Sequence, residues 1–534
     1  MTVPPARLRI ALAQTDQVVG DLAANAATML SWRDKAAAEG ADLMLFPELQ
    51  LIGYPPEDLV LKPALVERAE AELVRLAEAT SDGGPAMLVG TVIEAGGLLF
   101  NCVALLDGGT IAAVRQKREL ANHGAFDEKR LFAPGPLPDP IEFRGVKLGL
   151  PVGEDIWFPF VTAHLADRGA DILVSVHGSP FEVGKDMRRR NGICAARVHE
   201  TGLPILYLNR VGGQDELVFD GASFVMDAAG EIACRLPEWE ERLVVTEWVR
   251  GVDDRWCCLP ADIVQVQDHP ADIYCAMLVA LRDFVARNGF AGVAVTLTGS
   301  VESALGVAIA VDAVGAERVR CLATVRHAAE SVHLPGVRCD DVPVDAATDA
   351  LGAMLAPLLP HSAHGAALLG DALSTLVADA AGYVLLSTAN KGEIATGAVS
   401  HGGYAPLKDA YRTTVIDLAQ WRNAARPDFG KGPQGPVIAE RLIATPSAGP
   451  EGAGAGSLPP HDLLDPILYG LVEQEKSVDD LAAMGFERTL VAQIEALLHA
   501  SEHRRRQAPP GVKIGARSFG RDRRYPISNA FRTA

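Results

Sequence analysis

The stretch that decides the fold of the first half is Val146-Lys147-Leu148-Gly149-Leu150-Pro151-Val152-Gly153-Glu154-Asp155-Ile156-Trp157-Phe158-Pro159. An apolar run ends abruptly here in two carboxylates and a tryptophan, which predicts a strand over residues 148–152 and then a sharp turn. Many α/β hydrolytic enzymes present a nucleophile at such a corner, because the bend holds one side chain beside free backbone N–H groups. The corner residue in this chain is Gly153, which has no side chain to react.

Apolar strands and helical segments alternate on both sides of this corner. Helices are predicted at residues 21–39, 63–80 and 185–201. Strands are predicted at residues 8–13, 43–46, 86–91, 98–106, 110–114, 148–152, 172–176, 204–208, 222–226 and 243–249. So many strands with helices between them predict an α/β domain made of two sheets covered by helices.

Length and charge exclude several classes of protein. The chain has 534 residues, too many for one hydrophobic core, and we expect domains at residues 1–265 and 266–534. A net charge of -19 argues against a general nucleic-acid binder, because neutralising phosphates requires clustered Lys and Arg. The start lacks a signal-peptide pattern and no run reaches the roughly 18 apolar residues of a membrane span. We therefore expect a cytoplasmic protein that does not bind membranes.

The cysteines and the polar residues at strand ends limit the chemistry further. The 8 cysteines contain no C-x-x-C pair, which favours buried, reduced thiols over disulfides or a structural zinc site. Glu48, Lys117 and the Gly153 corner each follow an apolar strand, where an open α/β sheet usually places its site. Taken singly, a Glu or Lys at such a position is more often a solvated charge.

Taken together, these positions match one family. The matching stretches are Phe46-Pro47-Glu48-Leu49 with residues 53–59, Lys117-Arg118-Glu119-Leu120 with residues 126–130, Gly153-Glu154-Asp155-Ile156-Trp157, and residues 211–216 with 219–221. They resemble the nitrilase-type amidase domain, and in particular the glutaminase half of the glutamine-dependent NAD⁺ synthetases. The resemblance implies that Glu48 is the general base and Lys117 the oxyanion partner. It also places Gly153 where the family has its cysteine nucleophile, so we expect glutamine hydrolysis to be absent or vestigial.

Two other residues bear on this expectation. His177 stands where the family usually has asparagine. Cys194 is an alternative thiol, but it lies in the helical segment beyond the corner, and nothing in the spacing places its sulfur at the turn. We therefore do not expect Cys194 to replace the missing nucleophile.

The second half begins after a junction that we place near residues 264–269. A helix at 272–288 has the apolar spacing of a packing face. A strand at 293–297 then leads through Thr298-Gly299-Ser300-Val301-Glu302-Ser303 into a helix at 304–314. A strand, a short Gly/Ser loop and a helix start form an anion cradle, because the first helical N–H groups are unpaired. Ser303 could equally be a simple helix cap.

This loop resembles the Ser-Gly-Gly-x-Asp-Ser pyrophosphate loop of the synthetase half of the same family. The resemblance implies that residues 298–303 bind ATP and that Glu302 holds Mg²⁺. Thr298, Ser300 and Glu302 depart from the family residues. If the loop requires a positive φ at Ser300, a residue with a Cβ suffers strain of about 1 kcal/mol there.

Later stretches match the family unevenly. Asn390, Lys391 and Glu393 are kept from a Thr-Gly-Asn-Lys-Ser-Glu segment, which implies nucleotide contacts by Asn390 and Lys391 and a second Mg²⁺ ligand in Glu393. Other family motifs are absent or altered at residues 323–327, 366–379, 400–404 and 446–451, and residues 452–456 form a Gly/Ala linker. The tail matches again at residues 458–468, 502–511 and 519–527. Its arginine run has two interpretations, a structural face or a contact with a subunit or substrate phosphate.

The resemblance implies an α/β protein in which a nitrilase-like αββα sandwich precedes an adenine-nucleotide α-hydrolase-like, doubly wound parallel sheet. Two functions remain open. One is a ligase that makes NAD⁺ from deamido-NAD, ATP and free ammonia, without the use of glutamine, in the homo-oligomers typical of the family. The other is a catalytically silent paralogue that coassembles with an active NAD⁺ synthetase as a regulator or scaffold.

Overall fold

The computed structural model describes residues 7–533 except 252–253, 268, 325–327, 343, 356–364, 399–401 and 445–457. Several altered motifs, at residues 325–327, 400–401 and 446–456, therefore lie outside the described residues. The chain folds as two compact units. One consists of Met1–Gln214 with Phe219–Val266, and the other of Asp215–Val218 with Gln267–Ala534.

The first unit contains two large sheets. A seven-stranded sheet has the order β15-β14-β1-β2-β3-β4-β5, and a six-stranded sheet has the order β13-β12-β9-β8-β7-β6. The seven strands are β1 (Arg7–Gln14), β2 (Leu43–Leu45), β3 (Ala86–Ala95), β4 (Leu98–Asp107), β5 (Thr110–Gln116), β14 (Arg242–Arg250) and β15 (Trp256–Cys258). The six are β6 (Ile141–Phe143), β7 (Val146–Gly149), β8 (Ile172–His177), β9 (Ile205–Asn209), β12 (Phe224–Met226) and β13 (Ile232–Arg235). A separate pair is formed by β10 (Val211–Gln214) and β11 (Leu217–Asp220).

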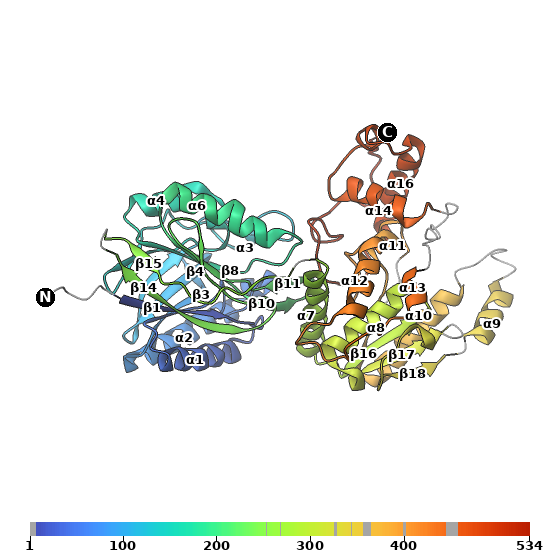
Figure 1. Cartoon of the computed structure of the whole chain (residues 1–534), viewed down its shortest axis with the longest axis horizontal. Coiled ribbons are helices and arrows are strands. Elements are labelled where there is room, and N and C mark those ends of the chain that lie inside the picture. The colour runs from blue at the N-terminus through green and yellow to red at the C-terminus, as the bar shows by residue number, and fades with distance from the viewer. Residues whose placement is uncertain are drawn as a thin grey trace. The chain divides into compact units, whose positions relative to one another are not determined.

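Alternation along the strands builds four layers. On β1, Ile10 and Leu12 enter a core shared by the two sheets, whereas Ala11 and Ala13 enter an outer core. Two pairs of helices cover the outer faces: α1 (Leu22–Ala38) with α2 (Pro63–Ala79), and α4 (Pro159–Asp167) with α6 (Ala195–Thr201). Figure 1 shows these helix, sheet, sheet and helix layers. The predicted αββα sandwich is confirmed.

The decisive corner differs in detail from the prediction. Strand β7 ends at Gly149 instead of continuing to residue 152, because Pro151 has no N–H to donate to a ladder. Val152 makes only an isolated bridge to Val176. Gly153 then opens the 3₁₀ helix η3 (Gly153–Trp157) with φ at 51°, a left-handed conformation that glycine adopts readily.

The second unit is built on a parallel sheet with the order β18-β17-β16-β19. Its strands are β16 (Gly292–Leu297), β17 (Val319–Ala323), β18 (Arg338–Asp341) and β19 (Tyr383–Leu386). Helix α10 (Gly365–Ala381) packs Ala378 against Ala294 on one face. On the other face, Gly306 of α8 (Val301–Val314) approaches Val295. Helices on both faces confirm the expected doubly wound arrangement.

The remaining elements are helices of various lengths. In the first unit they are η1 (Glu57–Leu61), η2 (Thr80–Asp82), α3 (Glu128–Leu131), α5 (Lys185–Met187) and the π-helix η4 (Arg188–Cys194). In the second they are α7 (Ala271–Arg287), η5 (Ala316–Arg318), η6 (Ala328–Ser331), α9 (Asp345–Leu355), α11 (Lys391–Ala395), α12 (Arg412–Ala424), α13 (Glu440–Ala444), α14 (His461–Val472), α15 (Val478–Ala483), α16 (Arg488–Ala500) and α17 (Glu502–Arg505). In the part of the chain that the structure describes, no helix has both the length and the apolar character to cross a bilayer.

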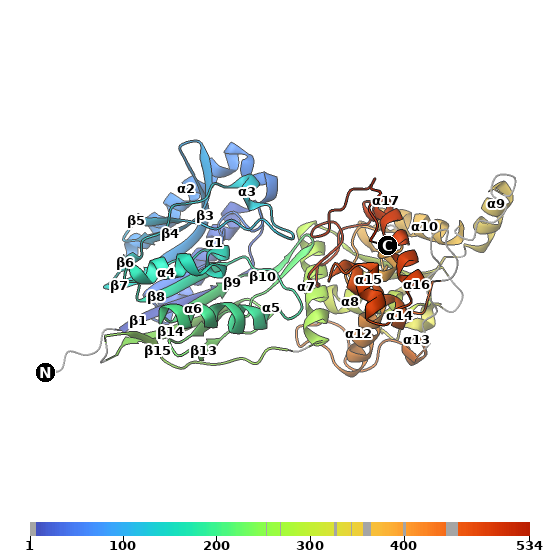
Figure 2. The ribbon, with the colours of Figure 1, turned by 90° about the horizontal axis from the view of Figure 1, so that it is seen from above.

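The C-terminal helices form a core of their own. Residues of α11, α14, α15 and α16 share one apolar cluster, and Figure 2 shows α14–α17 gathered in the red part of the chain. Arg505 is buried beneath them, where it donates to Glu502 and to the carbonyl oxygens of Ala395 and Leu498. This geometry favours the structural interpretation for that member of the arginine run.

The cysteines depart partly from expectation. All 8 are free thiols, as predicted, but the expectation that they are buried is wrong for Cys257 and Cys339. Both are exposed, and each lies on a short strand at the end of its sheet, β15 or β18. On β15 the burial alternates, so Cys257 is exposed while Cys258 is buried.

Candidate functional site

The first unit brings Glu48, Lys117 and Gly153 together. Glu48 lies in the turn after β2, Lys117 directly follows β5, and Gly153 begins η3. The Nζ atom of Lys117 is 2.7 Å from Oε1 of Glu48, and both side chains are buried. An ideal Cβ on Gly153 would lie 2.6 and 2.7 Å from the carboxylate oxygens of Glu48 and 2.8 Å from Nζ of Lys117. A side chain at position 153 would therefore project directly between the carboxylate and the ammonium group.

A second carboxylate, Glu128 of α3, completes this centre. Its Oε2 is 2.7 Å from Nζ of Lys117, and it accepts a hydrogen bond of 2.9 Å from the N–H of Ala121. Burial raises the pKa of Glu128. Burial alone would lower the pKa of Lys117, but Glu128 and Glu48 raise it above its ordinary value, so the lysine stays an ammonium ion.

Glu128 is absent from the site residues expected from sequence. The only signal for it is its place in the Phe126–Arg130 stretch that matches the family. Its contact with Lys117 joins residues that lie apart along the chain, and spacing alone does not reveal it.

The Glu48 carboxylate is fixed by further donors. Asn101 donates through Nδ2 to Oε1 at 2.8 Å, and the N–H of Gly178 donates to Oε2 at 3.0 Å. The turn that carries Glu48 also packs closely on β3, because a Cβ on Gly90 would lie 2.4 Å from the nitrogen of Leu49. These contacts fix the orientation of the carboxylate toward Lys117.

Asp155 holds the Gly153 corner in place. Its carboxylate accepts hydrogen bonds from the N–H groups of Val152 at 3.0 Å, Arg118 at 3.1 Å and Glu119 at 2.6 Å. It also pairs with the guanidinium of Arg115 at 2.8 Å. Burial raises the pKa of Asp155, while the charge of Arg115 opposes this rise. One buried carboxylate thus ties the start of η3 to the segment on either side of Lys117.

His177 lies at the end of β8, next to the Gly178 that donates to Glu48. Its ring stacks on Tyr207 with 3.9 Å between centroids, and Nε2 is 2.7 Å from Oγ of Ser175. Burial, followed by the charges of Arg189 and Lys117, lowers the pKa of His177 well below its ordinary value. The imidazole is therefore neutral.

Cys194 is a core residue. It is fully buried in the apolar cluster that includes Val161, Leu165 and Val198 between the outer helices and the six-stranded sheet. Burial raises the pKa of Cys194 to about 12. A protonated thiol in apolar surroundings is a poor nucleophile, so Cys194 does not stand in for a side chain at position 153.

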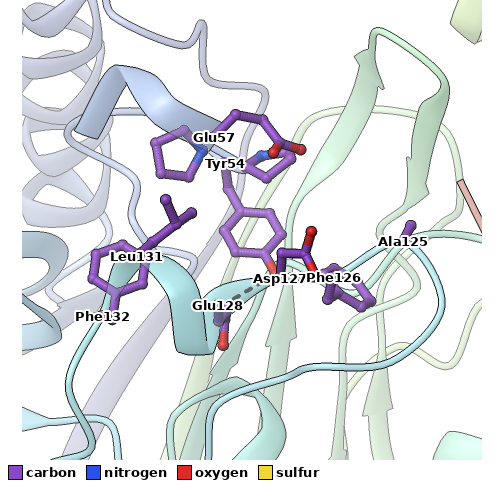
Figure 3. Close-up of a pocket in the computed structure, with 10 residues that line it drawn as sticks. Tyr54, Glu57, Ala125, Phe126, Asp127, Glu128, Leu131 and Phe132 are labelled. Carbon is purple, nitrogen blue, oxygen red and sulfur yellow. Dashed lines mark hydrogen bonds between the residues drawn. The ribbon is translucent and has the colours of Figure 1, made fainter. Parts of the chain in front are cut away.

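A pocket opens beside the centre, and Figure 3 shows its lining. It is lined by Tyr54, Pro55, Pro56, Glu57, Ala125, Phe126, Asp127, Glu128, Leu131 and Phe132. The Tyr54 hydroxyl lies 3.5 Å from Oε1 of Glu128. Because Glu128 also contacts Lys117, the pocket reaches the edge of the buried charges.

The Thr298–Ser303 loop corrects two expectations in the second unit. Ser300, not Ser303, is the N-cap of α8, and its hydroxyl accepts from the N–H of Ser303 at 3.2 Å. Helix α8 accordingly begins at Val301 instead of residue 304. The strain considered for Ser300 is absent, because its φ is -91° and the positive φ of 81° falls on Gly299.

Hydroxyl groups line the start of α8. Oγ1 of Thr298 is 3.0 Å from Oγ of Ser300 and 3.3 Å from Oγ of Ser303. The first N–H groups of a helix attract anions because they are unpaired and lie at the positive end of the helix dipole. The loop thus joins a strand to a helix start, as the sequence predicts, and anion binding by residues 298–303 stays a prediction.

Glu302, Asn390 and Glu393 also meet here, because the parallel strands β16 and β19 end at the same edge of the sheet. Asn390 donates through Nδ2 to Oε1 of Glu302 at 3.0 Å, and Arg412 pairs with the same oxygen. Asn390 and Glu393 form a reciprocal capping box at α11. Burial and the charge of Glu302 raise the pKa of Glu393 to about 7.

Lys391 is fully buried and has other partners. Its Nζ lies 2.7 Å from Oδ1 of Asp409, pairs with Glu473 and donates to the carbonyl of Arg517 at 2.7 Å. None of these partners belongs to the Thr298–Ser303 loop. Within the described ranges, no group of three or more His, Cys, Asp and Glu side chains forms a metal site, so Glu302 and Glu393 would need ligand oxygens to complete one.

Comparison with known protein families identifies the two domains of the chain. Residues 9–252 match the carbon-nitrogen hydrolase family and residues 368–508 match the NAD synthase family. The two structural units follow the same order as these two matches, and the buried centre of Glu48, Lys117 and Glu128 lies within the first match. The chain thus combines a carbon-nitrogen hydrolase domain with an NAD synthase domain.

Relatives with this combination match the whole chain. The glutamine-dependent NAD(+) synthetase of Rhodobacter capsulatus is 40% identical over 551 residues, covering 98% of this chain and 99% of the relative. That of Xylella fastidiosa strain Temecula1 is 38% identical with the same coverage. The chain belongs to the family of glutamine-dependent NAD(+) synthetases.

Solved structures of glutamine-dependent NAD+ synthetases also match nearly the whole chain. The glutamine-dependent NAD+ synthetase of Acinetobacter baumannii, determined in complex with adenosine diphosphate, is 33% identical with a TM-score of 0.76 and 98% coverage of both chains. The synthetase of Cytophaga hutchinsonii has a TM-score of 0.78 at 18% identity, which shows the shared fold.

Proposed function

We propose that this chain is a synthetase of its family that has lost glutamine hydrolysis and amidates deamido-NAD with free ammonia. The observation that carries the proposal is Gly153. A side chain there would enter between Glu48 and Lys117, but only hydrogen is present, and the two charged groups contact each other directly at 2.7 Å. Without a thiolate, no covalent acyl intermediate can form on this unit.

The charged groups around Gly153 lie where a nucleophile at this position would need a base and a cation. We propose Glu48 as the residue that would act as general base and Lys117 as the cation that would stabilise a tetrahedral oxyanion. Asn101 and the N–H of Gly178 orient the carboxylate. In the absence of a nucleophile, these groups neutralise one another. Residues 1–265 are accordingly proposed as a silent amidase-type domain.

Residues 266–534 are proposed as the synthetase domain. The Thr298–Ser303 loop and Asn390 would bind ATP, with Lys391 nearby, and Glu302 and Glu393 would bind Mg²⁺. Carboxylates and phosphate oxygens are ligands that Mg²⁺ prefers, and the hydroxyl groups at the start of α8 suit a phosphate. ATP would supply the adenylyl group that activates the carboxylate of deamido-NAD, and ammonia would displace AMP.

One assay tests both parts. Purified protein is incubated with deamido-NAD, ATP and Mg²⁺ together with either ammonium chloride or glutamine, and NAD⁺, AMP and glutamate are measured. We expect NAD⁺ and AMP with ammonium and no glutamate with glutamine. Protein-dependent release of glutamate would contradict the loss of hydrolysis. The Rhodobacter capsulatus synthetase serves as the positive control.

A second candidate function rests on internal pairing at the synthetase site. Glu302 is held by Arg412 and Asn390, and Lys391 is held by Asp409 and Glu473. The groups that would meet metal and phosphate already have protein partners, which favours a silent regulator or scaffold that coassembles with an active synthetase. Calorimetry with ATP and Mg²⁺ separates the two candidates. Binding supports the ligase, whereas no heat together with co-elution with an active synthetase supports the scaffold.

A further inference from the structure

Cys321 and Cys339 face each other on neighbouring strands of the second unit. Strands β17 and β18 run parallel, and these two residues are partners in the register. Side chains on a strand alternate between faces, so in-register residues of a parallel pair point to the same face of the sheet. The two sulfurs are accordingly within hydrogen-bonding reach of each other.

The two thiols differ in exposure. Cys339 lies on β18, the end strand of the sheet order, and is exposed. Cys321 lies on β17, between β18 and β16, and is fully buried. A reagent in solution can therefore meet Cys339, whereas Cys321 is placed to react with whatever Cys339 carries.

We propose that Cys321 and Cys339 are a redox-sensitive pair that a low-molecular-weight disulfide, such as oxidised glutathione, converts into an intramolecular disulfide. Neighbouring strands lie about 4.7–4.9 Å apart, which falls within the Cα separation of about 4.4–6.8 Å that disulfides accept. The bond would join β17 to the end strand β18. The same sheet contains β16, the strand that precedes the Thr298–Ser303 loop.

The reaction balances as two thiol–disulfide exchanges. The Cys339 thiolate attacks one sulfur of the small disulfide, whose S–S bond breaks and releases one small thiolate. Cys321 gives its proton to that thiolate and, as a thiolate, attacks the Cys339 sulfur of the mixed disulfide, whose S–S bond breaks. The second small thiolate leaves and takes up from solvent the proton that Cys339 had lost. Both cysteine thiols are oxidised, and the small disulfide is reduced to two thiols.

The local environment supports these roles. The hydrogen bond from Cys321 lowers the pKa of Cys339, against the opposing effects of burial and of Asp341 and Asp340. A lower pKa gives a larger thiolate fraction, and the thiolate is the attacking species. The same hydrogen bond, followed by burial, raises the pKa of Cys321, which keeps it protonated until its partner has been modified.

Peptide mapping of the full-length protein tests the proposal. The protein is treated with oxidised glutathione, quenched in acid, alkylated without reduction and digested with trypsin. Cleavage after Arg320, Arg326 and Arg338 places the two cysteines on the separate peptides 321–326 and 339–391. We expect these peptides to be linked, with the loss of two hydrogen atoms, and dithiothreitol to separate them.

Cys257 provides a matched control. It is the other exposed cysteine, but its register partner on β14 is Val249. We expect Cys257 to stop at the mixed disulfide with glutathione, and its modification sets the oxidant concentration for the experiment. Cys339→Ser should abolish the link, and Cys257→Ser should retain it. Both positions are exposed, so we expect each variant to fold, and circular dichroism is the check.

Two outcomes would overturn the proposal. In one, Cys257 is fully modified while peptides 321–326 and 339–391 both carry only alkylated thiols. In the other, Cys339 carries glutathione and Cys321 remains free for alkylation. Either result would show that the pair cannot close, despite its register.

Discussion

At the scale of single residues, Lys117 is held between two buried carboxylates. Glu48 and Glu128 approach its Nζ at 2.7 Å each. Removing one partner of a buried ion pair costs more than the pair contributes, because the remaining charge stays buried without compensation. The centre is therefore sensitive to substitution even though no nucleophile is present.

Lys117→Met should lower the free energy of unfolding by about 3–5 kcal/mol, since it leaves Glu48 and Glu128 unpaired. Urea denaturation followed by fluorescence measures this change. Lys129→Met, at an exposed position of α3, the short helix that carries Glu128, is the matched control and should stay within about 0.5 kcal/mol of the wild type. Equal effects of the two variants would contradict a role for the lysine in balancing the buried carboxylates.

Gly153→Cys should acquire measurable release of glutamate from glutamine, because its Cβ would enter between Glu48 and Lys117. Gly153→Ala supplies the same Cβ without sulfur and should remain inactive. Both variants should lose about 1–2 kcal/mol of stability from the left-handed conformation at this position, and Glu48 and Lys117 must shift to make room, because the new Cβ would lie 2.6–2.8 Å from their charged atoms. An inactive but folded Gly153→Cys variant would show that other groups, such as His177, have diverged as well.

At the scale of elements, the Gly153 corner depends on Asp155. Three backbone N–H groups and Arg115 converge on its carboxylate. This arrangement connects the turn to the segment of Lys117 and defines where a side chain at position 153 would point.

Asp155→Ala should cost at least about 3 kcal/mol, because it leaves buried donors and the Arg115 charge unsatisfied. The neighbouring Glu154 is the control. Its main partner is His123, which is exposed, so Glu154→Ala should cost no more than about 1 kcal/mol. Thermal or urea denaturation of both variants gives the comparison. A small loss of stability in Asp155→Ala would argue against the role of Asp155 in holding the Gly153 corner.

Glu393 of α11 makes stability depend on pH, because burial and the charge of Glu302 raise its pKa. The folded-state pKa of Glu393 is about 7, against an ordinary value of 4.5. Between these pH values the folded state keeps a proton that the unfolded chain has lost, so stability falls as the pH rises through this window. One pKa unit corresponds to about 1.4 kcal/mol, which predicts a loss on the order of 3 kcal/mol from Glu393.

Glu393→Gln should remove this part of the pH dependence, because glutamine does not titrate and its oxygen can still accept from Asn390. Urea denaturation at pH 5 and pH 8 should show a smaller loss of stability for this variant than for the wild type. Glu440→Gln, at an exposed position, should keep the wild-type slope. An unchanged slope in Glu393→Gln would mean that the carboxyl titrates alike in both states.

Sequence patterns located the elements well where apolar runs were long. The strands around Leu43, Ile172 and Leu297 appear where expected, because strands that are buried on both faces leave continuous apolar runs in the sequence. Helix α8 began earlier than expected, since Ser300 and not Ser303 caps it. Either serine satisfies the sequence preference for an N-cap, and only the backbone geometry decides between them.

At the scale of the whole molecule, sequence alone supported the two-part architecture, but it did not supply the long-range partners. Glu128, Arg412 and Asp409 complete the two candidate sites through contacts that join separate elements. Such contacts depend on how the elements pack, so the spacing of residues along the chain does not predict them. The family resemblance predicts such a long-range contact only where both residues belong to motifs of the family.

The family resemblance also leads us to expect a homo-oligomer in solution, as closed symmetric assemblies are common among soluble enzymes. Light scattering during size-exclusion chromatography should give a mass that is a multiple of the 56.5 kDa chain. A single peak at the mass of one chain, independent of concentration, would contradict this expectation.

The glycine at the corner also has a consequence for the history of the gene. Glycine and cysteine codons can differ by a single base, and Glu48 and Lys117 still border position 153. Selection of a mutagenised population for growth on glutamine as nitrogen donor should therefore return substitutions at codon 153 before any others. One base change at such a codon is therefore enough to separate a chain that carries the thiol from one that does not.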